Sequence, residues 1–181
     1  MASYKFRVLI DTDSSEEIFR DIVISTTENF ETFYQAILAA FEFNGQELAS
    51  FYVSNESWDK GHEIALMDMQ ISDSLDAPST MKDTLIEDMV NTSNQKFILV
   101  YDFLRMWCFM IELNEIIQEN FDGPMLDLSV GEAPNEFDKD IDLSGDMTGH
   151  ADLGNEIDDI FNDHGDEDDF GGFENIDDFD L

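Results

Sequence analysis

The beginning of the chain alternates apolar and polar residues with the period of a β-strand. Over residues 4–10, apolar side chains occupy every second position: Tyr4, Phe6, Val8 and Ile10. A turn-forming run of Asp, Thr and Ser follows at residues 11–15. A second alternating run then places one face at Ile18, Arg20, Ile22 and Ile24. Because a two-residue period is typical of a half-buried strand, the two runs predict an N-terminal hairpin.

The next segment changes to the period of a helix. Its apolar side chains recur at spacings of three and four, which places them on one helical face: Phe30, Phe33, Tyr34, Ile37, Leu38 and Phe41. Asn29 suits the N-cap position, and Glu31 would lie in the first turn. Asn44 and Gly45 supply the signal for the helix to end. The pattern predicts one long amphipathic helix.

Shorter runs complete the predicted order of elements. Asp83 is expected to cap a short helix over residues 84–90. Four strands are expected after the long helix, at residues 48–53, 63–67, 96–103 and 106–116. The order is therefore ββαββαββ, an α+β fold in which a mixed or antiparallel sheet packs against one long and one short helix. The long helix is expected to cover one face of the sheet.

The last predicted hairpin has an unusual turn. Its apolar arms meet around Leu104, Arg105 and Met106, and the turn contains no Gly, Asn or Pro. Tight hairpin turns need residues with positive φ, which Gly, Asn and Asp adopt most easily. The turn propensity of its residues therefore does not explain why the chain turns here.

Charge divides the chain into two parts. Residues 1–118 contain 21 acidic and 7 basic residues, whereas residues 119–181 contain 22 acidic residues and one basic residue, Lys139. Apolar periodicity also ends near residue 120, and a highly charged segment with few apolar residues cannot offset the entropy lost on folding. We therefore expect an α+β domain at residues 1–118, followed by an acidic, low-complexity and mostly disordered tail at residues 119–181.

The net charge of −35 narrows the range of partners. Nucleic acids and anionic membranes would repel the chain, so neither is expected to bind it directly, whereas basic protein surfaces would attract it. No apolar run reaches the roughly 20 residues of a membrane span, and the first residues contain no apolar signal-peptide core. Cys108 is the only cysteine, which excludes an internal disulfide and fits a reducing compartment. A cytoplasmic location is expected.

The side chains that could act as a nucleophile or a metal ligand lack the neighbours that catalysis or metal binding needs. Cys108 lies between Trp107 and Phe109, without a base to stabilise its thiolate. His62 stands in a loop without a second ligand at metal-binding spacing. The sequence predicts no catalytic residue, no cofactor and no metal site.

Four stretches carry a likeness to a known family. They are IFRDIVIS (residues 18–25), the expected helix and strand at residues 29–51, YDFLRMWCFMIEL (residues 101–113) and GEAPNEF (residues 131–137). In this order they resemble the plasmid pRiA4b ORF-3-like domain family of bacterial proteins, over residues 4–137. The resemblance implies the fold but no activity, because the family has no settled biochemical function.

The resemblance also shows which polar positions differ in this chain. Its pattern Tyr-Asp-Phe-Gly-Asp-x-Trp-x-His-x-Ile is matched at positions that we predict to be structural: Tyr101, Asp102, Phe103, Trp107 and Ile111. The family's turn glycine, its neighbouring acidic residue and its three histidines correspond here to Leu104, Arg105, Phe109, Glu47 and Ala49. Histidines and carboxylates gathered from separate segments would suit a metal or acid–base site. Any such histidine-dependent chemistry is not expected in this chain.

Three functional hypotheses remain. The first is a non-enzymatic interaction module whose acidic tail engages basic protein surfaces. The second is recruitment of DNA-replication or repair factors, because the C-terminal tip resembles the acidic ends of bacterial single-stranded-DNA-binding proteins. The tail residues expected to contact a partner are Phe170, Phe173, Asp177, Asp178, Phe179, Asp180 and Leu181. The third is a degenerate hydrolase-like enzyme with a site assembled from Asp102, Glu47 and His62.

Overall fold

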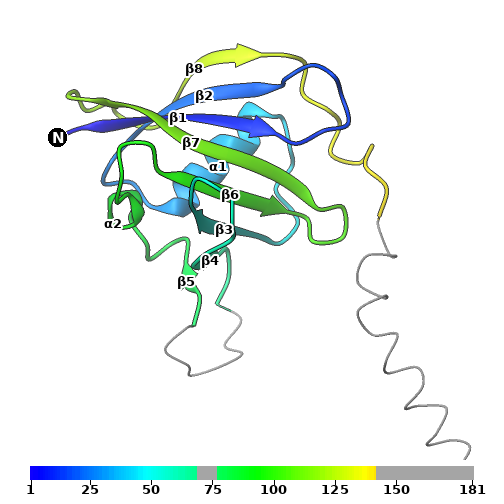
Figure 1. Cartoon of the computed structure of the whole chain (residues 1–181), viewed down its shortest axis with the longest axis horizontal. Helices are drawn as coiled ribbons and strands as arrows, with labels where there is room; N and C mark the ends of the chain where they lie inside the picture. Colours follow the sequence, from blue (N-terminus) through cyan, green and yellow to red (C-terminus); the bar gives the residue numbers. More distant parts are fainter. Residues whose placement is uncertain (69–76, 142–181) are drawn as a thin grey trace, which may run out of the picture. The chain divides into compact units, whose positions relative to one another are not determined.

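The alternating and helical runs form one sheet and two helices in the computed structural model, which describes residues 1–68 and 77–141 (Figure 1). The strands are β1 (Ser3–Ile10), β2 (Phe19–Ser25), β3 (Ala49–Ser54), β4 (Glu63–Ala65), β5 (Ser79–Thr80), β6 (Lys96–Tyr101), β7 (Trp107–Ile117) and β8 (Met125–Val130). The helices are α1 (Phe30–Ala40) and α2 (Ile86–Met89).

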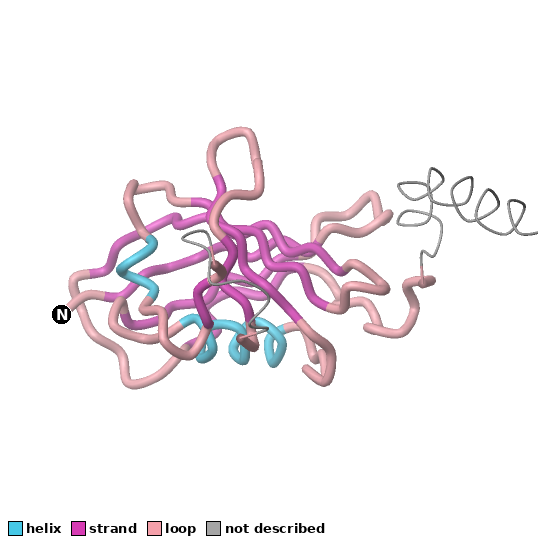
Figure 2. The backbone as a smooth tube through the Cα atoms, turned by 90° about the horizontal axis from the view of Figure 1, so that it is seen from below, coloured by secondary structure: helices cyan, strands magenta, loops and turns pink. Residues whose placement is uncertain are grey.

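The strands lie in the order β5-β4-β3-β6-β7-β1-β2-β8. Each neighbouring pair is antiparallel except β4 and β5, which are parallel. Figure 2 shows α1 lying along one face of the sheet. The predicted α+β class, with a mixed sheet covered by one long helix, is therefore confirmed. Within the described ranges no helix is long and apolar enough to cross a membrane.

The predicted N-terminal hairpin is formed by β1 and β2, and Arg20 gives it an unexpected role. Arg20 lies on the buried face of β2 and is only 5% exposed. Its guanidinium donates hydrogen bonds to the carbonyl oxygens of Ala40, Phe19 and Val130, and it stacks over the ring of Phe41. Burial lowers the pKa of Arg20. A buried cation is costly unless it is hydrogen-bonded, so these contacts tie the end of α1 and strand β8 to β2.

Helix α1 begins where the sequence predicts and ends earlier. The Asn29 side chain accepts a hydrogen bond from the Thr32 amide at 2.8 Å, which is N-cap geometry. The predicted end at Asn44 and Gly45 is wrong, because the last helical residue is Ala40. Glu42 adopts a φ of 60°, and the amides of Glu42 and Phe43 donate to the carbonyls of Ala39 and Leu38. This is a Schellman motif in which Glu occupies the position usually held by Gly.

An aromatic cluster fills the space between α1 and the sheet. The rings of Phe33 and Phe51 stack at 5.7 Å, and Phe33 lies 4.8 Å from Phe6. Phe30 contacts Phe51 and Phe97 edge to face. All five rings have no exposed surface, so the apolar helical face predicted from the sequence forms the core.

The second helix differs from its prediction. It spans Ile86–Met89, with Leu85 at the N-cap position and no side-chain cap. Asp83 instead accepts a hydrogen bond from the Thr80 hydroxyl at 2.8 Å. The predicted Asp83 cap is therefore wrong, because the turn that leaves β5 uses this carboxylate.

The sheet extends beyond the expected domain boundary at residue 118. Strand β8 pairs with β2 as an edge strand, and Met1–Ile141 form one compact unit. Most residues of β8 are exposed, so its order comes from backbone pairing with β2 rather than from burial of its side chains. Leu126, Leu128 and Val130 do alternate with Asp127 and Ser129, so the expected end of apolar periodicity near residue 120 is wrong for this strand. Residues 142–181, which include the rest of the predicted acidic tail, lie outside the described residues.

Core substitutions on α1 should be costly. Phe33→Ala and Ile37→Ala should each lower the free energy of unfolding by about 2 to 5 kcal/mol, because both side chains are fully buried. Gln35→Ala, on the exposed face of the same helix, is the matched control. Urea unfolding measures all three, and a cost below about 0.5 kcal/mol for both core variants would contradict the packing described.

Two truncations should separate β8 and the residues after it from the acidic tail. A chain that ends after Ile141 should melt at or slightly above the temperature of the full chain, because it loses 15 acidic residues and no basic ones. A chain that ends after Asn120 also loses β8 and the Val130 carbonyl that accepts from Arg20. Its melting temperature should fall by roughly 10 °C or more. Equal melting of the two truncated chains would show that β8 contributes no stability.

Candidate functional site

Three family-like segments that are distant in sequence meet at one end of the sheet. Glu136 is 7% exposed, and its carboxylate accepts hydrogen bonds from the Asn44 amide at 2.7 Å and the Tyr101 hydroxyl at 3.0 Å. The Glu136 carbonyl accepts from the Trp107 indole at 3.0 Å. We call these four residues the Glu136 cluster. It joins the segment after α1, the β6–β7 hairpin and the chain that follows β8.

Local structure explains why Tyr101 and Trp107 lie together. Tyr101 is the last residue of β6, Trp107 is the first residue of β7, and the two are cross-strand partners. Phe43 packs against both rings, at 5.7 Å and 5.3 Å. Burial, and then the hydrogen bond to Glu136, raise the pKa of the Tyr101 phenol. The phenol therefore stays protonated at neutral pH and acts as a donor rather than as a base.

Asp102 shapes the turn between β6 and β7. The turn contains five residues, 102–106, whereas the sequence predicts strands that reach 103 and restart at 106. Asp102 has a φ of 59°, and one of its carboxylate oxygens accepts from the amides of Leu104 and Arg105. The other oxygen pairs with the Arg105 guanidinium at 3.1 Å. Asp tolerates the left-handed conformation that Gly would otherwise supply, which explains how a turn without Gly or Asn forms.

The remaining family-like positions have different environments. Ile111 is fully buried in the core, whereas Phe103 is 43% exposed in the turn. Phe109, where the family has a histidine, is fully buried against the rings of Phe41 and Phe43. Ala49 is buried. Aromatic and aliphatic packing therefore occupies two of the three histidine positions, and the third is Glu47.

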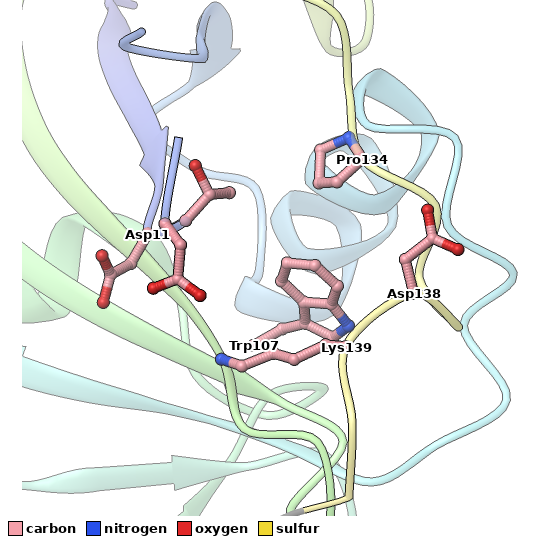
Figure 3. A pocket seen from close by; sticks show the side chains of 7 residues that line it. Asp11, Trp107, Pro134, Asp138 and Lys139 are labelled. Carbon is pink, nitrogen blue, oxygen red and sulfur yellow. The ribbon is translucent and has the colours of Figure 1, made fainter. Parts of the chain in front are cut away.

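A shallow pocket lies beside Trp107 (Figure 3). Its volume is about 200 Å³, and its lining is Asp11, Thr12, Asp13, Trp107, Pro134, Asp138 and Lys139. Figure 3 shows the Lys139 side chain running along the Trp107 ring, where its ammonium lies 5.2 Å from the ring centroid. The same ammonium donates to the Met106 carbonyl at 2.7 Å. Ligand pockets usually measure about 300 Å³ or more, and this one contains no nucleophile paired with a base.

The residues of the hydrolase hypothesis do not converge. Asp102 follows Tyr101, which pairs with Ala49 at the start of β3. The His62 carbonyl instead bonds to the amide of Val53, near the other end of that strand. Four residues of a strand span about 13 Å, so the two ends lie too far apart for direct proton transfer. The His62 imidazole is hydrogen-bonded to the Ser79 hydroxyl at 2.7 Å.

Cys108 is not placed as a nucleophile. Burial raises the pKa of its thiol, which disfavours the reactive thiolate. Within residues 1–68 and 77–141, no group of three or more His, Cys, Asp or Glu side chains is arranged to hold a metal ion. The predicted tail contacts, from Phe170 to Leu181, lie outside the described residues.

The sequence reasoning missed Glu136 and Asn44 as members of the buried cluster. Glu136 lies within the GEAPNEF stretch that carries the family likeness, so a signal was present. Its role could not be found from the chain alone, because a carboxylate that follows Pro and Asn is normally exposed. Only the return of this segment to the hairpin brings it to Tyr101.

Comparison with known proteins identifies the family of this chain. A family model described as plasmid pRiA4b ORF-3-like protein matches residues 2–171. This chain therefore belongs to the plasmid pRiA4b ORF-3-like family. The match continues well past residue 118, as the sheet does. No curated protein matches the chain.

A solved structure has the same fold. It is a protein of unknown function from Methanosarcina mazei Go1, with 19% sequence identity and a TM-score of 0.64. The match covers 92% of this chain and 90% of that chain. At this identity the likeness extends to the fold alone, and the neighbour brings no activity to this chain.

The geometry around Asp102 predicts a structural role for this carboxylate. Asp102→Asn keeps an oxygen for the Leu104 and Arg105 amides and should change the free energy of unfolding by about 1 to 2 kcal/mol or less. Asp102→Ala leaves those amides without their acceptor and should cost more, about 2 to 3 kcal/mol. Thermal and urea unfolding of both variants test this order. If Asp102→Asn removed a hydrolytic activity without changing stability, Asp102 would instead be catalytic.

Proposed function

We propose that this chain is a non-enzymatic protein-binding module that engages a basic partner through its acidic surface and its acidic C-terminal segment. The observation that carries the proposal is that most basic side chains already have partners within the chain. Of the eight Lys and Arg residues, all of which lie in the described part, seven have partners within the chain: Lys5, Arg7, Arg20, Lys60, Lys96, Arg105 and Lys139. The charge left to act on a partner is therefore overwhelmingly negative.

The ion pairs show that several of the basic side chains are already paired with carboxylates of the same chain, so they do not neutralise the remaining negative charge. Arg7 forms a bidentate pair with the buried carboxylate of Asp21, at 2.8 Å for each contact. Lys96 lies between Glu56 at 2.8 Å and Glu112 at 3.5 Å, and both carboxylates are substantially exposed. Both cations are held against strands of the sheet, and the eight basic residues of the chain cannot balance its 43 acidic residues. Long-range attraction then favours a basic partner and repels a second polyanion.

The polar atoms of the Glu136 cluster are occupied by hydrogen bonds within the chain, which favours a binding role over a catalytic one. Its carboxylate oxygens accept hydrogen bonds from Asn44 and Tyr101, and its carbonyl accepts from Trp107. A general base needs a free oxygen or nitrogen within reach of a substrate proton. The cluster offers its polar atoms to the protein itself, so it suits a scaffold.

Capture from cells that produce the protein tests this function. The full chain and a chain that ends after Ile141 are immobilised, and captured proteins are identified and then purified. The proposal expects a basic protein that binds the full chain and loses affinity at least about tenfold between roughly 50 mM and 300 mM salt. Removal of residues 142–181 should also weaken binding about tenfold, because 15 acidic residues are lost.

Two controls sharpen this experiment. A chain that lacks only residues 177–181 separates recognition of the C-terminal tip from the effect of total charge. A broad screen for hydrolytic activity on the purified full chain provides the opposite outcome. Salt-insensitive binding to a neutral or acidic partner, or turnover of a substrate, would contradict the proposed function.

A further inference from the structure

Exposed apolar side chains gather at the end of the β6–β7 hairpin. Five of the twelve large apolar side chains that the described residues expose belong to this region, and each is between 38% and 60% exposed. We call them the tip surface: Leu48, Phe103, Leu104, Met106 and Phe137. Large apolar groups that are gathered rather than scattered on a surface usually mark a contact with a partner.

Three segments of the chain meet to form the tip surface. The Leu48 carbonyl accepts a hydrogen bond from the Asp102 amide at 3.0 Å, which places the start of β3 against the turn. The Arg105 guanidinium lies 5.5 Å from the centroid of the Phe137 ring. The Lys139 ammonium bonds to the Met106 carbonyl, which holds the segment that contains Phe137 and Lys139 beside the turn. The tip surface is therefore assembled by tertiary contacts between three segments.

Hydrogen bonds fix the backbone of the turn that carries Phe103, Leu104 and Met106. Asp102 and Met106 both have positive φ, at 59° and 55°, and the Met106 amide donates to the Asp102 carbonyl at 2.6 Å. A left-handed conformation is unfavourable for a residue such as Met, so the surrounding contacts must impose it. The Asp102 carboxylate fixes the amides of Leu104 and Arg105. A rigid turn loses little conformational entropy when a partner binds its apolar side chains.

Charge identifies the kind of partner. Glu47 and Asp138 are adjacent in sequence to residues of the tip surface. The two nearby cations are already engaged, Arg105 with Asp102 and Lys139 with Met106. Exposed apolar groups of the tip surface are therefore accompanied by exposed carboxylates next to them in the chain, a combination that complements an apolar pocket with a basic rim. A second copy of this chain, with a net charge of −35, would be repelled.

We propose that the tip surface is the docking site for an apolar, basic-rimmed pocket on a partner protein. This inference rests on the proposed function and places its short-range contacts on the folded unit. Long-range attraction by acidic residues brings the partner close, and Leu104 and Phe137 then enter its pocket. Buried apolar anchors of this kind contribute most of the affinity at protein interfaces.

Site-directed photocrosslinking in the full chain tests the docking site. Benzoylphenylalanine is placed at position 104 and, as a control, at position 128. Leu128 is also exposed and apolar but lies on the edge strand β8. In lysate of cells that produce the protein, position 104 should crosslink to a basic protein and position 128 should not. Capture alone does not suffice, so the crosslinked protein is then purified and its affinity is measured.

Affinity measurements with the purified partner test whether the tip surface is the docking site. Leu104→Ser and Phe137→Ser should each weaken binding at least about tenfold, while Leu128→Ser should change it less than about twofold. All three side chains are exposed, and unchanged melting temperatures would show that the variants are folded. The inference is overturned by equal binding of Leu104→Ser, by capture of an acidic protein, by crosslinking mainly to a second copy, or by the absence of any crosslink at position 104.

The two proposals fail in different ways. If loss of residues 142–181 abolishes binding while Leu104→Ser binds normally, the acidic module stands and the tip surface is wrong. If Leu104→Ser abolishes binding that is insensitive to salt, the tip surface is a docking site but the partner is not recognised by charge.

Discussion

The packing of α1 against one face of the sheet is the contact on which the other features depend. Phe30 and Phe33 insert among rings from three strands, and this cluster excludes water completely. Once α1 is fixed on β3, β6 and β1, the chain must leave the helix at the end of the sheet. Glu42 makes this exit possible by taking a left-handed conformation. The segment after α1 is thereby placed beside the β6–β7 hairpin, where the polar contacts form.

A buried carboxylate then closes that end of the sheet. Glu136 loses hydration when it is buried, and the Asn44 amide and the Tyr101 hydroxyl compensate for it. The chain after β8 is held against the hairpin by these bonds and by the indole of Trp107. At one of the family's histidine positions, Phe109 packs against Phe43, which in turn contacts Tyr101 and Trp107 of the cluster. The result is a rigid end of the sheet whose polar groups are occupied.

The rigid end of the sheet keeps the apolar side chains of the tip surface exposed. Apolar side chains in a turn are costly in water, and the turn at 102–106 keeps Phe103 and Leu104 exposed in a conformation fixed by Asp102. In the proposed function, acidic residues elsewhere would attract a basic partner from a distance but would provide little shape. Apolar groups provide short-range fit but no attraction at distance. The proposed module combines the two, with charge selecting the class of partner and the tip surface selecting the geometry of binding.

The sequence by itself determined the α+β class, the apolar face and Asn29 cap of α1, the N-terminal hairpin and the acidic character, because these follow from local periodicity and composition. It placed the end of α1 at Gly45, because a Schellman turn through Glu42 carries no periodic signal, and the domain boundary at 118, because the short alternation of β8 lies within a strongly acidic segment. The Glu136 cluster and the tip surface also had to come from the tertiary structure. Both join segments that are far apart in the chain, and a side chain's burial and partners depend on which segments the fold brings beside it.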